Sequence, residues 1–71
     1  MAVHNRLRVL RAERRWSQSE LGRRFARPRD AATVSRWENE DTSPSVEDAF
    51  EAAHIFGVSI TDVFLYTPET N

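Results

Sequence analysis

WSQSELGRRFARPRDAATVSRWEN is the sequence of residues 16–39, and it decides the fold. Its first part predicts a helix beginning after Ser17, because the Ser17 hydroxyl can accept from the backbone N–H of Glu20 while the Glu20 carboxylate accepts from the Ser17 N–H. Pro28 ends this helix near Ala26. Asp30 is a suitable N-cap for a second helix over about residues 31–39. The stretch therefore predicts two short helices joined by a turn.

Each of these two helices has an apolar face. Leu21 and Phe25 lie four residues apart in the first helix, and Val34 and Trp37 share a face of the second. Gly22 stands inside the first helix, where a glycine costs about 1 kcal/mol relative to alanine. We expect it to mark a close crossing by the second helix. The outer face of the second helix is left available to a partner.

Three further helices are expected outside this stretch. The first covers about residues 5–15 and has Leu7 and Leu10 on one face. The next begins after Ser45 and ends at Gly57, which suits a C-terminal cap. Its apolar stripe should close the core and consists of Val46, Ala49, Phe50, Ala53 and Phe56. A short fifth helix follows Ser59 and contains Ile60, Val63 and Phe64.

Several of these segments, in this order, resemble the DNA-binding helix-turn-helix domains of the Cro and phage-repressor type, the XRE family. The matching residues are 17–18, 20–22, 34–39, 44–45 and 56–60, and the resemblance covers roughly residues 5–65. It implies an all-α, compact five-helix, lambda-repressor-like domain that acts as a transcriptional regulator, specifically a repressor. One departure is Ala26, where the family usually has a glycine in a tight turn. The connection over residues 26–29 is two residues longer than usual and replaces that turn.

The resemblance also implies which residues read DNA. The helix starting near Ala31 would enter the major groove of double-stranded DNA. Arg36 should contribute most, because a guanidinium paired with guanine O6 and N7 gives roughly 1 to 3 kcal/mol of discrimination. The full set expected to face base edges is Ala31, Ala32, Thr33, Ser35 and Arg36.

Other residues would hold the DNA backbone or support the reading helix. Gln18, at the start of the preceding helix, is expected to bind a phosphate. Arg27, Arg29 and Asn39 are further candidates for phosphate contacts. The resemblance also implies a buried or half-buried ion pair between Arg11 and Glu38.

Charge is divided unevenly along the chain, although the formal net charge is only −1. All ten basic residues are arginines within residues 6–36, where three carboxylates leave a net charge of +7. Residues 37–71 have eight carboxylates and no basic residue, a net charge of −8. This split favours one surface that faces phosphates and another that avoids them. For any single arginine, a merely solvated helix face is the alternative.

The two tryptophans leave a second binding mode open. Trp16 and Trp37 are expected in the core, but arginines near tryptophans are also typical of proteins that bind single strands. Titration with single-stranded and duplex oligonucleotides separates the two modes.

Composition sets aside most other functions. Seventy-one residues make a single domain, with an ordered core expected over residues 4–66. The chain has no cysteine, signal peptide or long apolar run, so we expect a cytoplasmic protein without membrane, metal or cofactor. Glu51 and His54 have the spacing used in dinuclear metal bundles, but no second such pair exists. No nucleophile elbow or phosphate-binding loop is present, so an enzyme is not expected.

Two further expectations concern partners. Alanines at positions 31 and 32 give a single subunit little sequence specificity, and a second subunit would add to it. We therefore expect a homodimer that binds an inverted repeat with half-sites about 34 Å apart. Its interface would be the carboxyl-terminal helix with Phe64, Leu65 and Tyr66. The alternative function is a protein-interaction or antitoxin-like adaptor module that binds a protein through the acidic C-terminal half.

Overall fold

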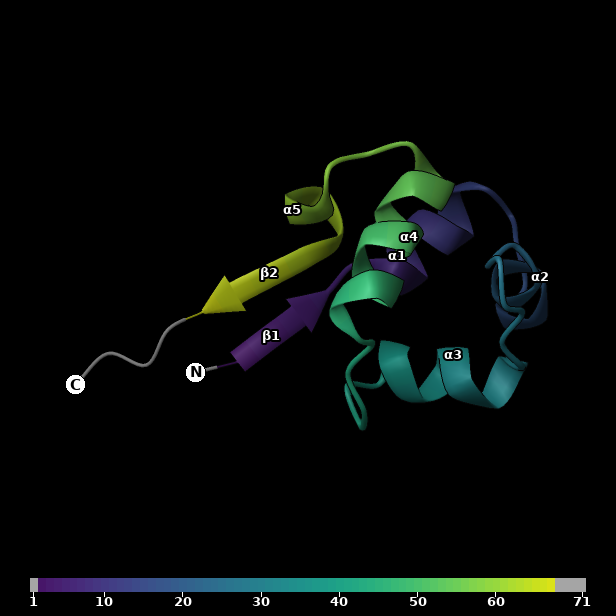
Figure 1. Cartoon of the computed structure of the whole chain (residues 1–71), viewed down its shortest axis with the longest axis horizontal. Coiled ribbons are helices and arrows are strands. Elements are labelled where there is room, and N and C mark those ends of the chain that lie inside the picture. Colours follow the sequence, from purple (N-terminus) through teal and green to yellow (C-terminus); the bar gives the residue numbers. More distant parts are fainter. Residues whose placement is uncertain (1, 68–71) are drawn as a thin grey trace.

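The computed structural model describes residues 2–67, and in this part of the chain five helices pack together beside a two-stranded ribbon (Figure 1). The helices are α1 (Leu7–Glu13), α2 (Gln18–Arg23), α3 (Ala31–Glu38), α4 (Val46–Phe56) and α5 (Ile60–Val63). Strands β1 (Ala2–Asn5) and β2 (Phe64–Thr67) are antiparallel, with Ala2 opposite Thr67 and Asn5 opposite Phe64. The predicted five-helix class is confirmed. The ribbon, which extends away from the helices, was not predicted.

The helix ends follow the local chemistry read from the sequence. The Ser17 hydroxyl accepts from the Glu20 N–H at 3.0 Å and the Glu20 carboxylate accepts from the Ser17 N–H at 3.3 Å, which confirms the capping box. Asp30 and Ser45 cap α3 and α4 through their side chains. Gly57 ends α4 with φ +69°, in the left-handed region that glycine adopts without strain. These caps fix where each helix begins and ends.

One apolar core lies between the helices. Its centre is formed by side chains that are almost fully buried, with Trp37 only 5 % exposed. Trp16 packs against this core from its edge and stacks on Phe56, with ring centroids 5.6 Å apart. The buried set is Leu7, Leu10, Leu21, Phe25, Val34, Trp37, Ala52, Ala53, Phe56 and Val63.

The first two helices are shorter than predicted. α1 begins at Leu7 because Asn5 belongs to β1, and the Asn5 side chain accepts from the Leu7 N–H at 3.2 Å. α2 ends at Arg23 rather than near Ala26, and the Arg24 N–H turns back to the Leu21 carbonyl at 3.0 Å. The connection from α2 to α3 therefore covers residues 24–30.

The apolar stripe predicted for α4 is partly wrong. Val46 and Phe50 are 71 % and 58 % exposed, and Ala52, which was not predicted to face inward, is buried. Ala53 and Phe56 are buried as predicted. Alanine lets a helix approach its neighbours closely, so the small side chains of α4 face the core. The larger side chains of Val46 and Phe50 are exposed to solvent.

The end of the described chain also differs from expectation. α5 ends at Val63, whose carbonyl accepts from the Arg6 N–H at 2.7 Å. Phe64, Leu65 and Tyr66 were predicted to continue or follow a helix, but they form β2. The backbone N–H and C=O groups of residues 64–67 need hydrogen-bond partners, and pairing with β1 provides them in place of a longer α5.

Candidate nucleic-acid interface

α3 presents an outer face opposite the side that enters the core. Val34 and Trp37 point inward, while Ala32 and Arg36 are exposed. The Arg36 guanidinium donates to the Thr33 hydroxyl at 3.3 Å, one turn back along the same face. The other predicted base-facing residues, Ala31, Thr33 and Ser35, are half-buried.

The start of α3 is held by Asp30. Its carboxylate accepts from the Thr33 backbone N–H at 2.8 Å. Hydrogen bonds from the Thr33 side chain and then from its backbone N–H lower the pKa of Asp30, and the nearby Arg36 charge adds to this effect. Asp30 is therefore ionised at neutral pH and keeps the first turn of α3 in place.

The connection between α2 and α3 explains Gly22. The Arg29 N–H donates to the Gly22 carbonyl at 2.9 Å. A Cβ atom at position 22 would lie 2.0 Å from the Arg29 carbonyl oxygen and 3.5 Å from a methyl group of Val34. The close neighbour of Gly22 is thus the backbone of the connection rather than the second helix, which corrects the sequence-based explanation.

Two carboxylates of α4 fasten this connection. The Glu51 carboxylate accepts from the Ala26 N–H at 2.5 Å, and Asp48 accepts from the Arg29 guanidinium at 2.7 Å. The Arg29 and Asp48 side chains are 25 % and 16 % exposed. Arg29 is therefore directed toward α4, whereas Arg27, the other arginine predicted for phosphate contact, is exposed.

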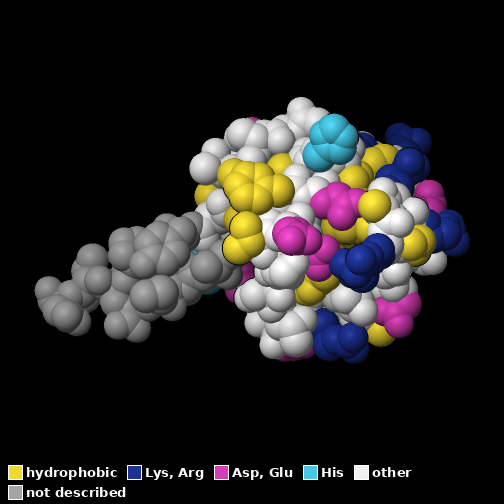
Figure 2. All heavy atoms as spheres, in the orientation of Figure 1, with side chains coloured by type: hydrophobic (Ala, Val, Ile, Leu, Met, Phe, Trp, Pro, Cys, Tyr) yellow, Lys and Arg dark blue, Asp and Glu magenta, His cyan; other side chains and the backbone are white. Residues whose placement is uncertain are grey.

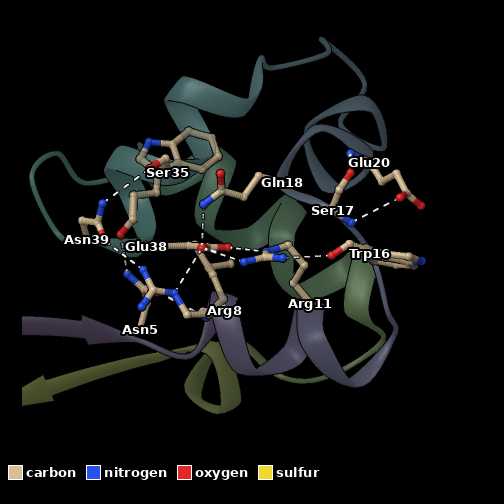
Figure 3. Close-up of polar contacts among 12 residues, drawn as sticks. Asn5, Arg8, Arg11, Trp16, Ser17, Gln18, Glu20, Ser35, Glu38 and Asn39 are labelled. Carbon is tan, nitrogen blue, oxygen red and sulfur yellow. Dashed lines mark hydrogen bonds and ion pairs between the residues drawn. The ribbon is translucent and has the colours of Figure 1, made fainter.

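Glu38, the last residue of α3, is the centre of a polar cluster (Figure 3). Its side chain is 0 % exposed. Arg11 donates to it through Nε at 2.7 Å and Nη2 at 3.1 Å, Gln18 through Nε2 at 3.1 Å, and Arg8 through Nε at 3.4 Å. The structure thus brings Arg11 and Glu38 together as the resemblance implied, and it ties α1 and α2 to the end of α3.

Burial and hydrogen bonding act on the Glu38 carboxyl in opposite directions. Burial raises the pKa of Glu38, but hydrogen bonds from Arg11 and Gln18 and the Arg11 charge outweigh it, so the pKa lies below its ordinary value of 4.5. A carboxyl group with a lowered pKa in the folded state stabilises that state above its unfolded pKa. This contribution is lost as the pH falls through the folded pKa.

We therefore expect the free energy of unfolding to decrease as the pH falls below about 4.5. Urea denaturation at a series of pH values measures this. Glu38→Gln should flatten the decrease, leaving the part contributed by Asp30. A decrease of the same steepness in Glu38→Gln and in the unchanged protein would show that Glu38 does not titrate as described.

Gln18 and Asn39 lie on either side of this cluster. One N–H of the Gln18 amide is used by Glu38, which leaves the second for another acceptor. Asn39 is exposed; it accepts from Arg8 Nη2 at 2.8 Å and donates to the Ser35 hydroxyl at 3.4 Å. Arg8 was not among the predicted site residues, although its spacing of three from Arg11 places both on one face of a helix.

Several arginines gather toward one side of the face shown in Figure 2. Figure 2 shows them on the side of the molecule where α2 and its connection to α3 lie, with carboxylates between them. No group of three or more histidine, aspartate or glutamate side chains able to hold a metal occurs among residues 2–67. Within the same residues, every helix is too short or too polar to cross a membrane.

A comparison with known families bears on this geometry. Residues 30–63 match the helix-turn-helix family model. The chain is a helix-turn-helix protein of the Cro and phage-repressor type. The matched residues cover α3, α4 and α5, and the capped helix α2 packed before α3 supplies the other half of the motif. No curated protein matches the chain. The family match indicates a DNA-binding regulator of transcription.

Proposed function

We propose that this helix-turn-helix protein is a repressor that binds double-stranded DNA in a sequence-specific manner, with α3 in the major groove. The observation that supports this most directly is the outer face of α3, where Arg36 is exposed between small side chains. Small neighbours let the helix approach the bases closely. The residues proposed to face the bases are Ala31, Ala32, Thr33, Ser35 and Arg36.

The contacts to phosphate would come from the edges of this face. Gln18 and Asn39 flank the Glu38 cluster and each keep donor groups that the described contacts do not use. Arg27 is exposed in the connection before α3. We include Arg29 as a proposed phosphate contact, and its ion pair with Asp48 means that it would have to share its donors.

We propose that the protein acts as a homodimer built from single domains of residues 1–71. A reading face with two alanines offers little discrimination per subunit, so a second copy adds specificity by contacting a second half-site. Val46 and Phe50 on α4 and Leu65 on β2 are large apolar side chains exposed to solvent, which supports association.

The alternative, an adaptor that binds a protein through its acidic half, has less support. Glu38 is buried, Asp48 is paired with Arg29, and Glu51 accepts from the Ala26 N–H. These three of the eight carboxylates in that half bind groups of the arginine-rich half of the same domain. They hold the arginine-rich half in shape, as a DNA-binding function requires.

Selection of bound sequences from a random duplex pool tests the proposal. We expect enrichment of an inverted repeat with half-sites about one helical turn apart. A pool that stays random after several rounds would contradict sequence-specific binding, and an enriched single half-site would contradict the homodimer.

Arg36→Ala should weaken binding to the enriched duplex about tenfold or more, because a bidentate contact to guanine is lost. Arg36→Lys should restore charge but not discrimination. Fluorescence anisotropy with the enriched duplex and with a scrambled one measures both. Equal affinity of Arg36→Ala and the unchanged protein for the enriched duplex would assign base reading to other residues.

A further inference from the structure

Arg8, on α1, extends the outer face of α3 beyond the helix-turn-helix itself. Ser35 bonds to Asn39, and Asn39 bonds to Arg8, so a continuous polar row leads from the middle of α3 onto α1 (Figure 3). The Arg8 side chain is 61 % exposed, compared with 17 % for Arg11. It therefore reaches solvent at the end of the proposed reading face.

The polar cluster around Glu38 has one more positive charge than negative charges, and Arg8 carries that excess. Glu38 is held by two short bonds from Arg11, whereas its contact with Arg8 Nε is the longest of the set at 3.4 Å. One buried carboxylate thus faces two guanidinium groups, and the exposed one has its charge uncompensated. The Glu40 carboxylate binds His4 Nδ1 at 3.1 Å and the Asn5 N–H at 3.3 Å, and it forms no ion pair with Arg8 within the described residues.

Arg8 and its neighbours keep donor groups that a phosphate could accept from. The hydrogen bonds found within residues 2–67 use Nε and Nη2 of Arg8, which leaves Nη1 for an outside acceptor. The Asn39 amide beside it has a second N–H, and Gln18 offers another across the Glu38 carboxylate. Exposed guanidinium and amide donors of this kind are suited to a phosphodiester oxygen.

We propose that Arg8 binds a phosphate of the DNA backbone at the end of α3 and so anchors the reading helix through α1. This inference rests on the proposed function. The contact carries no sequence information, so it acts equally on every duplex. Arg8 in this way adds a contact from outside the two helices that define the motif.

Salt dependence of binding provides the test. The probe is a labelled duplex of about 30 base pairs with random sequence, titrated by anisotropy from about 50 to 200 mM salt. Arg8→Gln should bind roughly tenfold more weakly at 0.1 M salt, as expected for loss of a charged hydrogen bond. The slope of log affinity against log salt should become shallower by about 0.9 for each subunit bound. Arg8→Lys should restore the slope.

Arg6→Gln is the matched control. Arg6 is also exposed, but its guanidinium donates to the Asp62 carbonyl at 3.4 Å, next to α5 rather than α3. Arg6→Gln should leave the slope of log affinity against log salt unchanged. If Arg8 had a purely structural role, Arg8→Gln would lower the melting temperature and the affinity for DNA but would leave the salt slope unchanged. That result, or normal DNA binding by Arg8→Gln, overturns this inference alone. Absence of salt-dependent duplex binding by the unchanged protein overturns the proposed function as well.

Discussion

Glu38→Ala is expected to lower the free energy of unfolding by about 3 to 5 kcal/mol, because removal of one member of a buried ion pair leaves the other charge without a partner. Arg11 is only 17 % exposed and directs Nε and Nη2 at the Glu38 carboxylate. In the variant its guanidinium keeps the Trp16 carbonyl, at 2.9 Å, as an acceptor but loses its counter-charge. Urea denaturation followed by tryptophan fluorescence measures the loss.

Three further variants test the physical reason given for this loss. Glu13→Ala removes an exposed carboxylate from α1 and should change stability by less than about 0.5 kcal/mol. Glu38→Gln keeps the shape of the side chain and should lie between the two. The double variant Arg11→Met with Glu38→Met should cost less than the two single changes added together, because it strands no charge. Equal stability of Glu38→Ala and Glu13→Ala would mean that the cluster contributes little to folding.

The parts of the fold that the sequence predicted are those determined by residues close together in the chain. The capping box of Ser17 with Glu20 spans four residues, and the cap at Asp30 and the glycine at position 57 act equally locally. The inward faces of α2 and α3 also follow from spacing alone, with Leu21 and Val34 both 0 % exposed.

The parts that the sequence did not predict depend on contacts between distant residues. Neither four-residue strand has a distinctive pattern, and each finds its pairing partner only in the other, some sixty positions away. The bond of Arg29 with Asp48 and that of Ala26 with Glu51 join a loop to a helix 19 and 25 residues further on. No local pattern indicates such pairs.

The exposed side chains of α4 illustrate the same limit. The predicted stripe included Val46 and Phe50, which the core leaves exposed, and it omitted Ala52, which the core buries. Which face of a helix turns inward depends on how closely its neighbours approach, and that distance is a property of the assembled domain. The same holds for charge, since the sequence divides it into a basic and an acidic half and the fold pairs Arg29 with Asp48 across that division.

Gly22→Ala is the second large effect that we expect, with a net loss of about 2 to 3 kcal/mol of unfolding free energy. The added methyl group would lie 2.0 Å from the Arg29 carbonyl oxygen, and a backbone atom cannot move aside as the end of a flexible side chain can. Overpacking costs typically 1 to 3 kcal/mol and occasionally more, and a clash with backbone belongs at the upper end, about 3 to 4 kcal/mol. The gain of about 1 kcal/mol in helix propensity reduces this to the net loss given above. Urea denaturation gives the net value.

Gly57→Ala is the control, because the two glycines are required for different reasons. A Cβ atom at position 57 meets nothing within 4 Å, so the cost there is only that of φ +69°, about 1 to 2 kcal/mol. Gly57→Asn should recover part of that loss, since asparagine tolerates the left-handed region better than alanine does. If Gly22→Ala proved no more destabilising than Gly57→Ala, the backbone at Arg29 would have to move away from position 22 at little cost, despite the hydrogen bonds that hold it.

The two variants should also differ in DNA binding. At position 22 the displaced Arg29 carbonyl precedes Asp30, the residue that caps α3, so relief of the clash shifts the start of the reading helix. Asp48 and Glu51 resist this shift from the other side through their bonds to the connection. We therefore expect Gly22→Ala to weaken duplex binding by more than its unfolded fraction accounts for, whereas Gly57→Ala, which perturbs only the end of α4, should bind in proportion to its folded fraction. Proportional binding by both variants would mean that α3 keeps its position despite the strain.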